Sequence, residues 1–302
     1  MKLVLTGATG FIGSALCSRL LERGHALTLL TRRTPPDATT PVKTWRHWTP
    51  GAPGDWETLL DGADGVINLA GEPIAAKRWT ETQKRRIHSS RIDATRSIVE
   101  AVTKAKRRPT LLLNASAVGY YGPHGQEIVT EETPAGTDFL SSVCRAWEEE
   151  AQQAKPLGLR VVRLRTGIVL GPGGGALAKM VLPFKLFIGG PLGPGTQWMP
   201  WIHLEDEIGL ILYLIENRQA AGAVNGTAPN PVTMKEFCQT LGKVMHRPSW
   251  APVPSFALRL ILGEMADMLL TGQRAVPTAA IELGYRFRYD NLSDALKACI
   301  PL

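Results

Sequence analysis

The stretch that decides the fold is LVLTGATGFIGSAL, residues 3–16. An apolar, strand-like run ends at Thr6, and glycines at positions 7, 10 and 13 lead into a helical pattern. Glycines at such a turn permit a tight bend and let backbone amides approach a pyrophosphate, which lies at the helix N-terminus. We therefore expect this turn to bind the phosphates of a dinucleotide cofactor. The residues assigned to it are Gly7, Thr9, Gly10, Phe11, Ile12 and Gly13.

The second strand-like run, Ala26–Thr31, ends in Thr31, Arg32 and Arg33. A site that prefers NAD(H) places Asp or Glu here, where the carboxylate accepts a hydrogen bond from the ribose 2′-hydroxyl. A guanidinium instead binds a 2′-phosphate through charge-assisted hydrogen bonds, and a carboxylate would repel that phosphate. The sequence therefore predicts NADP(H) as the cofactor, with these three residues at its adenosine ribose. The alternative is a pair of solvated arginines at the start of a loop.

Beyond this turn, short apolar runs alternate with longer amphipathic ones. The predicted strands are 3–6, Ala26–Thr31, 65–69, 110–114, 160–165 and 223–227, and the long predicted helices are 11–23, 80–104 and 139–154. This alternation predicts an α/β fold with a doubly wound, mainly parallel sheet and helices on both faces. The strands are nearly continuous apolar runs, as expected for strands that are buried on both sides.

After residue 170 the sequence becomes rich in Gly and Pro, and short helical patterns alternate with prolines. We expect this part to form a smaller C-terminal α+β substrate-binding module, composed of residues 171–203 and 229–302. Residues 1–170 are expected to form the NADP-binding domain, with 204–228 returning to it.

Composition narrows the classes of partner. The 34 basic and 27 acidic residues give a net charge of +7 without a long Lys/Arg block, so we expect anionic small molecules and no nucleic acid. The four cysteines are scattered, which is typical of a reducing compartment and indicates neither disulfides nor a metal site. No signal peptide and no apolar run of membrane-spanning length is evident, so we expect a cytoplasmic protein without a membrane partner.

The order of motifs resembles that of extended short-chain dehydrogenases/reductases. The matching stretches are TGATGFIG (6–13), NLAG (68–71), NASAVGYYG (114–122), RLRTGIVLGP (163–172) and WIHLED (201–206). More narrowly, NLAGEPIAAKRWT, WEEEA and GQRAVP resemble the atypical, epimerase-like group related to nucleoside-diphosphate-sugar epimerases. The resemblance implies a Rossmann fold and an NADP(H)-binding, epimerase-like oxidoreductase that acts on a small anionic or nucleotide-linked substrate.

The resemblance also implies roles for individual positions. Leu69 and Ala70 of NLAG should pass under the nicotinamide ribose and phosphates. Gly71 of NLAG and Ala115 of NASAVGYYG are assigned to the cofactor site with them. Ser116 matches the residue that hydrogen-bonds the substrate, and Arg91 takes the place of an Asn on the long helix that faces the cofactor. Val169 matches a contact to the carboxamide, and Arg274 matches an arginine placed against a sugar-nucleotide diphosphate.

The resemblance fails in DFLSSVCRAWEEEA, residues 138–151. The superfamily's catalytic pair is Tyr-x-x-x-Lys, with a Glu four residues after the Lys. Alignment on Glu148 puts Leu140 and Cys144 at the two positions, and a shift by one residue gives Phe139 and Val143. None of these side chains can replace a tyrosine whose pKa a lysine lowers. The ordinary mechanism therefore cannot operate unchanged.

Two tyrosines offer a substitute. Tyr120 and Tyr121 follow Ser116 at the carboxyl end of a predicted strand, where doubly wound folds place ligands. With Ser116, one of them could protonate an alkoxide if a cation lowered its pKa. The alternatives are that the tyrosines pack beneath the following loop and that Ser116 bonds to local backbone.

Three further questions stay open. Lys77, on a predicted lid loop, either meets the anionic substrate or is solvated. A homodimer through helices 80–104 and 139–154 is an option that their periodicity does not decide. Because the Tyr/Lys pair is missing while the dinucleotide turn is present, a non-catalytic NADP(H)-binding redox sensor or scaffold is the alternative to an enzyme.

Overall fold

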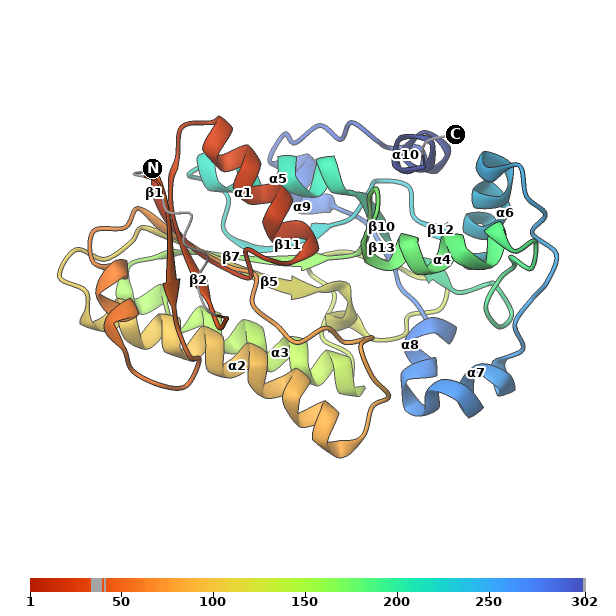
Figure 1. The fold of residues 1–302 in the computed structure, drawn as a ribbon, viewed down its shortest axis with the longest axis horizontal. Helices are drawn as coiled ribbons and strands as arrows, with labels where there is room; N and C mark the ends of the chain where they lie inside the picture. The colour runs from red at the N-terminus through yellow and green to blue at the C-terminus, as the bar shows by residue number, and fades with distance from the viewer. Residues whose placement is uncertain (34–39, 41, 301–302) are drawn as a thin grey trace.

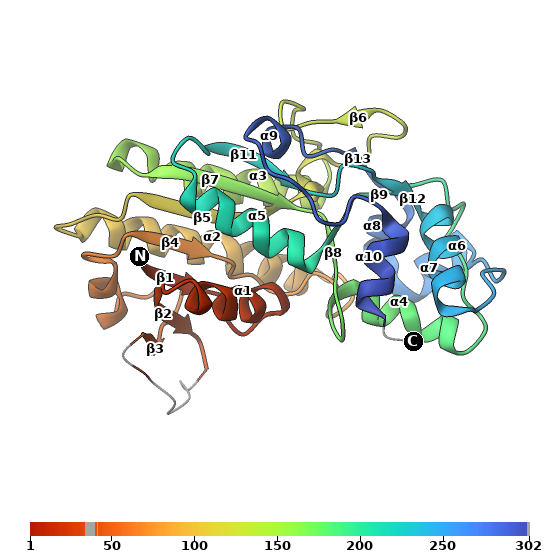
Figure 2. The same ribbon diagram turned by 90° about the horizontal axis from the view of Figure 1, so that it is seen from above.

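The structure, a computed structural model, describes residues 1–33, 40 and 42–300. Its centre is a seven-stranded sheet in the order β11-β7-β5-β4-β1-β2-β3, and every neighbouring pair is parallel (Figures 1 and 2). Its strands are β1 (Lys2–Thr6), β2 (Ala26–Thr31), β3 (Lys43–His47), β4 (Gly65–Asn68), β5 (Leu111–Ala117), β7 (Arg160–Thr166) and β11 (Gly222–Gly226). The predicted doubly wound parallel sheet is confirmed.

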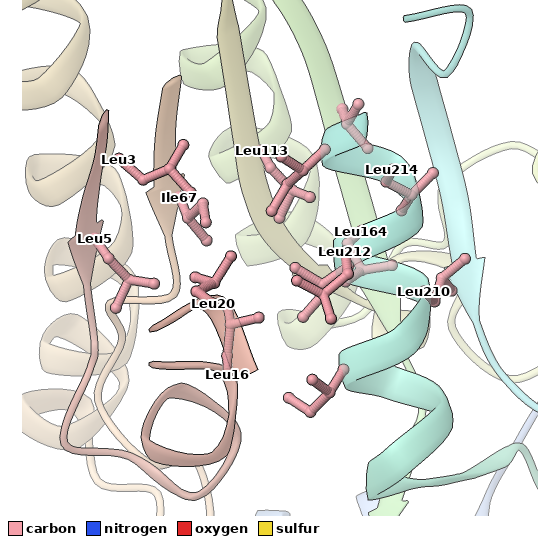
Figure 3. Close-up of a cluster of buried hydrophobic side chains, with 14 of the residues drawn as sticks. Leu3, Leu5, Leu16, Leu20, Ile67, Leu113, Leu164, Leu210, Leu212 and Leu214 are labelled. Carbon is pink, nitrogen blue, oxygen red and sulfur yellow. The ribbon is translucent and has the colours of Figure 1, made fainter. Parts of the chain in front are cut away.

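Four helices cover the sheet: α1 (Phe11–Glu22) and α5 (Leu204–Glu216) on one face, and α2 (Glu81–Lys104) and α3 (Phe139–Gln152) on the other. Side chains alternate between the faces of a strand, so Leu3 and Leu5 join the core beside α1 and α5, whereas Val4 joins the opposite core. Figure 3 shows the first of these cores, in which Leu16 of α1 and Leu212 of α5 meet the strands. Burial on both faces explains why the strand sequences are nearly continuously apolar.

The prediction missed the edge strand β3. Its sequence, KTWRH, is half-exposed or exposed throughout, because an edge strand is covered on one side only, and it therefore lacks the apolar run that marks the central strands. Strand β5 extends to Ala117, beyond the predicted end at 114, so Ser116 lies within the strand. Tyr120 and Tyr121 form part of a short 3-10 helix, η2 (Val118–Tyr121), where the sequence had suggested a loop.

The remaining elements lie mostly beyond the carboxyl ends of the strands. The helices are α4 (Gly175–Lys185), α6 (Met234–Met245), α7 (Ser255–Leu262), α8 (Asp267–Leu270), α9 (Thr278–Glu282) and α10 (Leu292–Cys299), and the 3-10 helices are η1 (Asp55–Leu60), η3 (Lys155–Leu157) and η4 (Gly263–Ala266). Two-stranded pairs are formed by β6 (Ile128–Val129) with β13 (Arg274–Ala275), β8 (Ile168–Leu170) with β10 (Trp201–His203), and β9 (Trp198–Met199) with β12 (Val232–Thr233).

This C-terminal part has a hydrophobic core of its own. Phe184 of α4, Trp201 of β10, Phe237 of α6 and Leu296 of α10 are buried in it together. In contrast, Ala280 of α9 belongs to the main core beneath the sheet. The predicted boundaries of the two domains remain a prediction, and residues 301–302 of the predicted module lie outside the described part. Within the described part, no helix combines the length and the apolar character needed to cross a membrane.

Candidate cofactor and substrate site

The glycine turn between β1 and α1 has no room for side chains. Gly7 has a φ of 73°, and a Cβ there would lie 2.6 Å from the carbonyl oxygen of Leu69. A Cβ on Gly13 would lie 2.2 Å from the carbonyl oxygen of Gly7. No side chain caps α1 at Gly10 and its first turn holds no acid, so its first amides are left for an anion. The turn therefore fits a dinucleotide pyrophosphate.

The other residues predicted in this turn lie around it. Thr9 is exposed, whereas Ile12 is half-buried against the main core. The ring of Phe11 is enclosed by three glycines of the segment that leads into α4: a Cβ on Gly171, Gly174 or Gly175 would lie 2.9, 2.5 or 3.0 Å from it. A Cβ on Gly175 would also lie 3.2 Å from the carbonyl oxygen of Val169, which places the predicted carboxamide contact near the same ring. The C-terminal part of the chain thus packs directly on the glycine turn.

The predicted 2′-phosphate residues stand one strand away from this turn, since β2 pairs with β1. Thr31 is buried, and its hydroxyl accepts a hydrogen bond from the backbone amide of Arg33 at 3.2 Å. Arg32 and Arg33 are both exposed, and none of the ion pairs between described residues includes them. Their guanidinium groups are therefore available to a phosphate.

A buried polar network, which the sequence did not predict, joins strands β1, β4 and β5. The Thr6 hydroxyl donates to Asn68 Oδ1 at 2.6 Å, and Asn68 Nδ2 donates to Asn114 Oδ1 at 2.7 Å and to Thr95 Oγ1 at 2.9 Å. Asn68 and Asn114 are partners in the register between β4 and β5 and are fully buried. The network fixes the backbone just before Leu69, Ala70 and Ala115. Two Asn residues that end apolar runs were its only signal in the sequence.

Arg91 shapes the loop that follows β4. Its guanidinium donates to the carbonyl oxygens of Glu72 at 3.1 Å and Ile87 at 2.9 Å, and it lies 5.1 Å from the ring centre of Trp147. A Cβ on Gly71 would lie 3.1 Å from the guanidinium carbon, so Arg91 and Gly71 are in contact. Burial lowers the pKa of Arg91. The structure thus brings these two predicted cofactor residues together.

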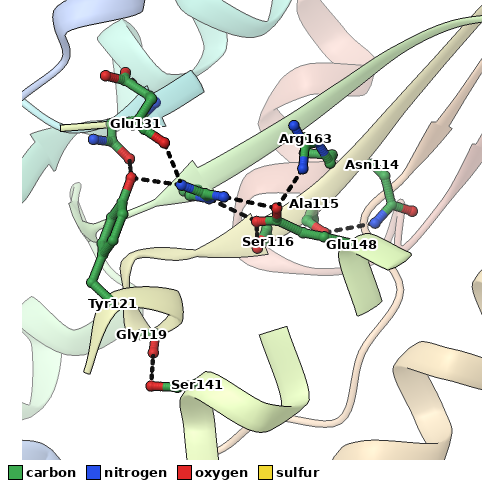
Figure 4. A network of polar contacts seen from close by, with 11 residues as sticks. Asn114, Ala115, Ser116, Gly119, Tyr121, Glu131, Ser141, Glu148 and Arg163 are labelled. Atoms are coloured by element: carbon green, nitrogen blue, oxygen red, sulfur yellow. Dashed lines mark hydrogen bonds and ion pairs between the residues drawn. The ribbon is translucent and has the colours of Figure 1, made fainter. Parts of the chain in front are cut away.

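Ser116 is joined to a buried ion pair, as Figure 4 shows. Its hydroxyl donates to Glu148 Oε1 at 2.8 Å, and the same carboxylate accepts two hydrogen bonds from Arg165, at 2.8 and 2.9 Å. Arg163 donates to Glu148 Oε2 at 3.0 Å. Glu148 therefore anchors α3 to strands β5 and β7, and the Ser116 proton is engaged with it.

The two tyrosines differ in their surroundings. Tyr121 is buried; its hydroxyl donates to Asn225 Oδ1 at 2.6 Å and accepts from Arg165 at 3.0 Å. Burial raises the pKa of Tyr121 to about 12, although the Arg165 charge opposes this effect. The ring of Tyr120 is half-buried, with the Arg165 guanidinium 3.5 Å from its centre. Among the described residues, no hydrogen bond to the Tyr120 hydroxyl is found. Tyr120 is therefore the tyrosine whose hydroxyl is available.

The residues at the positions of the missing pair are apolar in character. Leu140 packs against Gly119 of η2, where a Cβ would lie 3.4 Å from the leucine Cβ and 4.0 Å from Cys144 Sγ. Burial raises the pKa of Cys144 to about 12, so its thiol is neutral and cannot serve as a base. Neither position offers a proton-transfer group.

The two predicted substrate residues lie on different elements. Arg274, on β13, stacks over Trp198 at 4.5 Å from the ring centre, and the Trp198 indole donates to Gln126 Oε1 at 3.0 Å. Lys77 is exposed on the loop between β4 and α2. That loop is attached to the C-terminal part, because Lys179 of α4 donates to the carbonyl oxygen of Ala75 at 3.3 Å. No contact between described residues joins Lys77 to Arg274.

An ion pair also joins the start of α2 to the C-terminal part of the chain. Lys84, in the first turn of α2, lies 2.8 Å from Glu264 of η4. The guanidinium of Arg78 would come within 3.0 Å of a Cβ on Gly263, so the loop before α2 also touches η4. The loop that carries Lys77 is therefore held between the sheet and the C-terminal helices.

The sequence and structure match those of known proteins over nearly the whole chain. Residues 3–225 match the family described as the NAD dependent epimerase/dehydratase family, and residues 253–299 match a domain of unknown function, DUF1731. The chain is 44% identical over 301 residues to "Epimerase family protein SDR39U1 homolog, chloroplastic" of Arabidopsis thaliana, covering 99% of this chain and 86% of that protein.

Two crystal structures are similar. Human epimerase family protein SDR39U1 (isoform 2), crystallised with NADPH, has a TM-score of 0.87 and 35% identity over 98% of each chain. A nucleoside-diphosphate sugar epimerase from Corynebacterium glutamicum has a TM-score of 0.78 and 34% identity, over 99% of this chain and 57% of that one. The predicted family and the predicted nicotinamide dinucleotide are confirmed at this level, because the chain belongs to the NAD dependent epimerase/dehydratase family.

Proposed function

We propose that this protein binds NADP(H) and carries out epimerase-like oxidoreduction on a small anionic or nucleotide-linked substrate. The observation that carries the proposal is the β1–α1 turn, in which Gly7 and Gly13 exclude side chains and no side chain caps the first amides of α1. The exposed Arg32 and Arg33 at the end of β2 favour a 2′-phosphate over a free 2′-hydroxyl. Support comes from the human relative that was crystallised with NADPH.

In this proposal, the cofactor lies across the carboxyl ends of the strands. When bound, NADP⁺ can accept a hydride from a substrate carbon and NADPH can return one. The β1–α1 turn holds the phosphates of the cofactor. The residues assigned to the other parts of the cofactor are Leu69, Ala70, Gly71, Arg91, Ala115 and Val169. The Asn68–Asn114 hydrogen bond keeps the backbone at these positions in place, so that the cofactor meets a fixed edge.

For proton transfer we propose Ser116, Tyr120 and Tyr121 as the candidate residues, with Tyr120 first. The Tyr120 hydroxyl has no hydrogen-bond partner among the described residues, and the Arg165 guanidinium stacks on the Tyr120 ring, whereas the hydroxyls of Ser116 and Tyr121 both donate to buried acceptors. For either of these two to act, its present hydrogen bond would have to break. Tyr120 needs no such change.

For substrate binding we propose Arg274 and Lys77. The guanidinium of Arg274 is oriented by the Trp198 ring, and Lys77 is exposed on the loop between the sheet and α4. Both are cations, which suits an anionic group such as a diphosphate. We assign residues 171–203 and 229–302 to the substrate-binding module, and a homodimer through α2 and α3 remains part of the proposal.

Cofactor choice can be tested by titrating NADPH and NADH into the wild type and Arg32→Ala. Loss of a charged partner of the 2′-phosphate should weaken NADPH binding by about 2–5 kcal/mol and leave NADH binding unchanged. Arg218→Ala is the matched control, because Arg218 is an exposed arginine at the opposite end of the sheet, before β11. An unchanged NADPH preference in Arg32→Ala would contradict the assignment.

A second function is an NADP(H)-binding redox sensor or scaffold without turnover. It is favoured by one observation: Ser116 and Tyr121 are locked into a buried network, and Leu140 and Cys144 occupy the positions of the catalytic pair. Mass spectrometry of small molecules released from the natively expressed protein separates the two. NADP(H) with a second anionic metabolite supports the enzyme, whereas NADP(H) alone at full occupancy supports the sensor.

A further inference from the structure

Exposed hydrophobic side chains gather at one end of the molecule. Twelve large hydrophobic residues are exposed among the described residues, and eight of them come from α4, the turn after it, the segment before α7, and α7 itself. These eight are Leu182, Leu186, Phe187, Ile188, Trp250, Phe256, Leu260 and Ile261, and between 54% and 77% of each is exposed. We call this set the apolar tip. Scattered exposed hydrophobic residues are ordinary, but such a concentration marks an interaction surface.

The elements of the apolar tip lie together. Figures 1 and 2 both place α4, α6 and α7 at the end of the molecule far from the N-terminus. The Trp250 indole donates to the carbonyl oxygen of Phe187 at 3.1 Å, and the Val253 amide donates to that of Pro191 at 2.9 Å, so two extended segments run side by side. On α4 and on α7, Leu182 with Leu186 and Phe256 with Leu260 are each spaced by four residues and therefore share a helix face.

Phe187 has an unfavourable backbone conformation. Its φ is 63°, in the left-handed region that bulky side chains avoid. The ring is 54% exposed, and the Arg247 guanidinium lies 4.5 Å from its centre. Backbone strain of this kind is kept where the surrounding structure fixes a side chain for a purpose. The exposed Phe187 therefore lies beside the half-buried guanidinium of Arg247.

The two segments that contribute the apolar tip carry cations and no carboxylates. Residues 151–204 and 237–263, which contribute all eight side chains, include no Asp or Glu. They carry Lys179, Lys185, Lys243 and Arg247, none of which forms an ion pair with another described residue, whereas Arg259 pairs with Asp267. A surface of exposed aromatic and aliphatic side chains with unpaired cations complements a negatively charged, partly apolar partner.

We propose that the apolar tip binds the surface of an anionic phospholipid bilayer. The Trp, Phe, Leu and Ile side chains would enter the boundary between head groups and acyl chains, and the lysines with Arg247 would contact lipid phosphates. A second copy of the chain is a poorer partner, because a symmetric contact would bring these unpaired cations together. The proposal departs from the expectation of no membrane partner, and it requires contact with one surface only.

The test is sedimentation of the full-length protein with two kinds of vesicle, phosphatidylcholine alone and phosphatidylcholine mixed with phosphatidylglycerol. The wild type should bind the anionic vesicles, and binding should weaken as salt rises. Phe256→Ser/Leu260→Ser should bind them at least roughly tenfold less, because each lost side chain removes buried apolar area. The matched control is Ile128→Ser/Ile281→Ser, which removes two hydrophobic residues that are 57% and 52% exposed elsewhere and should not change binding.

A charge pair completes the test. Lys185→Glu should weaken binding to the anionic vesicles, whereas Lys106→Glu, an exposed lysine after α2, should not. All four variants should keep the wild-type NADPH affinity, which shows that they are folded. The proposal is overturned if the wild type fails to bind anionic vesicles, or if the apolar-tip variants bind as well as their controls. It is also overturned if the apolar tip instead forms a dimer that Phe256→Ser/Leu260→Ser abolishes.

Discussion

Arg165 and Glu148 form a two-point ion pair in the interior of the protein, with Nε and Nη2 of the arginine 2.8 and 2.9 Å from the two carboxylate oxygens. The two residues are 2% and 1% exposed. The pair ties α3 to β7, and the Ser116 hydroxyl and the Tyr121 hydroxyl are bonded to its opposite ends. The residues proposed for proton transfer are thus positioned by one buried charge pair.

Arg165→Met should therefore destabilise the protein strongly. Without Arg165, the buried Glu148 carboxylate keeps Arg163 as its charged partner at Oε2 and loses both hydrogen bonds from Arg165. Removal of one partner of a buried ion pair costs about 3–5 kcal/mol in the free energy of unfolding. Glu148→Met/Arg165→Met should lose less stability than Arg165→Met, because the charge that is then left without a partner belongs to the half-buried Arg163 and not to the buried Glu148. Urea denaturation measures both. Arg96→Met is the control: Arg96 is exposed and its partner Glu150 is only half-buried, so the loss should be about 0–1 kcal/mol.

Tyr121→Phe should lower stability, whereas Tyr120→Phe should lower turnover. The Tyr121 hydroxyl satisfies Asn225 and Arg165, so its removal should cost about 1–3 kcal/mol of stability and leave NADPH affinity unchanged. Tyr120→Phe removes a hydroxyl that has no partner among the described residues, and it should leave stability unchanged while it reduces turnover. Thermal unfolding, NADPH titration and a turnover assay test the pair. If Tyr121→Phe lost turnover at full stability, our ranking of the two tyrosines would be wrong.

Gly13→Ala should abolish tight NADPH binding. Its Cβ would lie 2.2 Å from the carbonyl oxygen of Gly7, so the phosphate turn must open to admit it. We expect the affinity to fall at least tenfold, or about 1.4 kcal/mol. Gly24→Ala is the control, because Gly24 has a φ of 75° with nothing within 4 Å of a Cβ. It should cost about 1 kcal/mol of stability through backbone strain and leave NADPH affinity intact.

Glu207 should make stability fall as pH rises. It is fully buried in α5, its Oε1 accepts a hydrogen bond from the Thr166 hydroxyl at 2.8 Å, and Oε2 has no partner among the described residues. Burial raises the pKa of Glu207 to about 8, while the Thr166 hydrogen bond opposes the rise. The folded state therefore binds a proton that the unfolded state releases at its ordinary pKa, 4.5. This stabilisation is complete below the unfolded pKa and is lost as pH rises toward the folded pKa.

Glu207→Gln tests this sign. The amide cannot ionise, so the variant should gain stability relative to the wild type by roughly 1 kcal/mol per pH unit as pH rises from the unfolded to the folded pKa. Denaturation of both proteins at a series of pH values gives the difference between their free energies of unfolding. Groups that titrate alike in both proteins cancel in this difference. A difference that stays constant with pH would show that Glu207 is already ionised in the folded protein.

The sequence alone determined the sheet and the glycine turn after β1. Alternation of apolar runs with amphipathic ones depends on local periodicity, so the strands of the sheet interior were evident, whereas the half-exposed edge strand β3 was not. Gly7 and Gly13 could also be assigned from the sequence, because the φ of 73° and the close approach to Leu69 follow from a turn that only glycine permits.

Only the tertiary structure decided what the polar residues near the predicted site do. Ser116, Tyr121 and Glu148 lie in different segments, and their hydrogen bonds depend on Arg165 and Asn225, which enter from β7 and β11. Likewise, the apolar tip combines α4 with α7, far apart in the chain. A one-dimensional pattern specifies which side chains are buried or turned outward within one element. Contacts between elements are set by packing, which brings distant residues together.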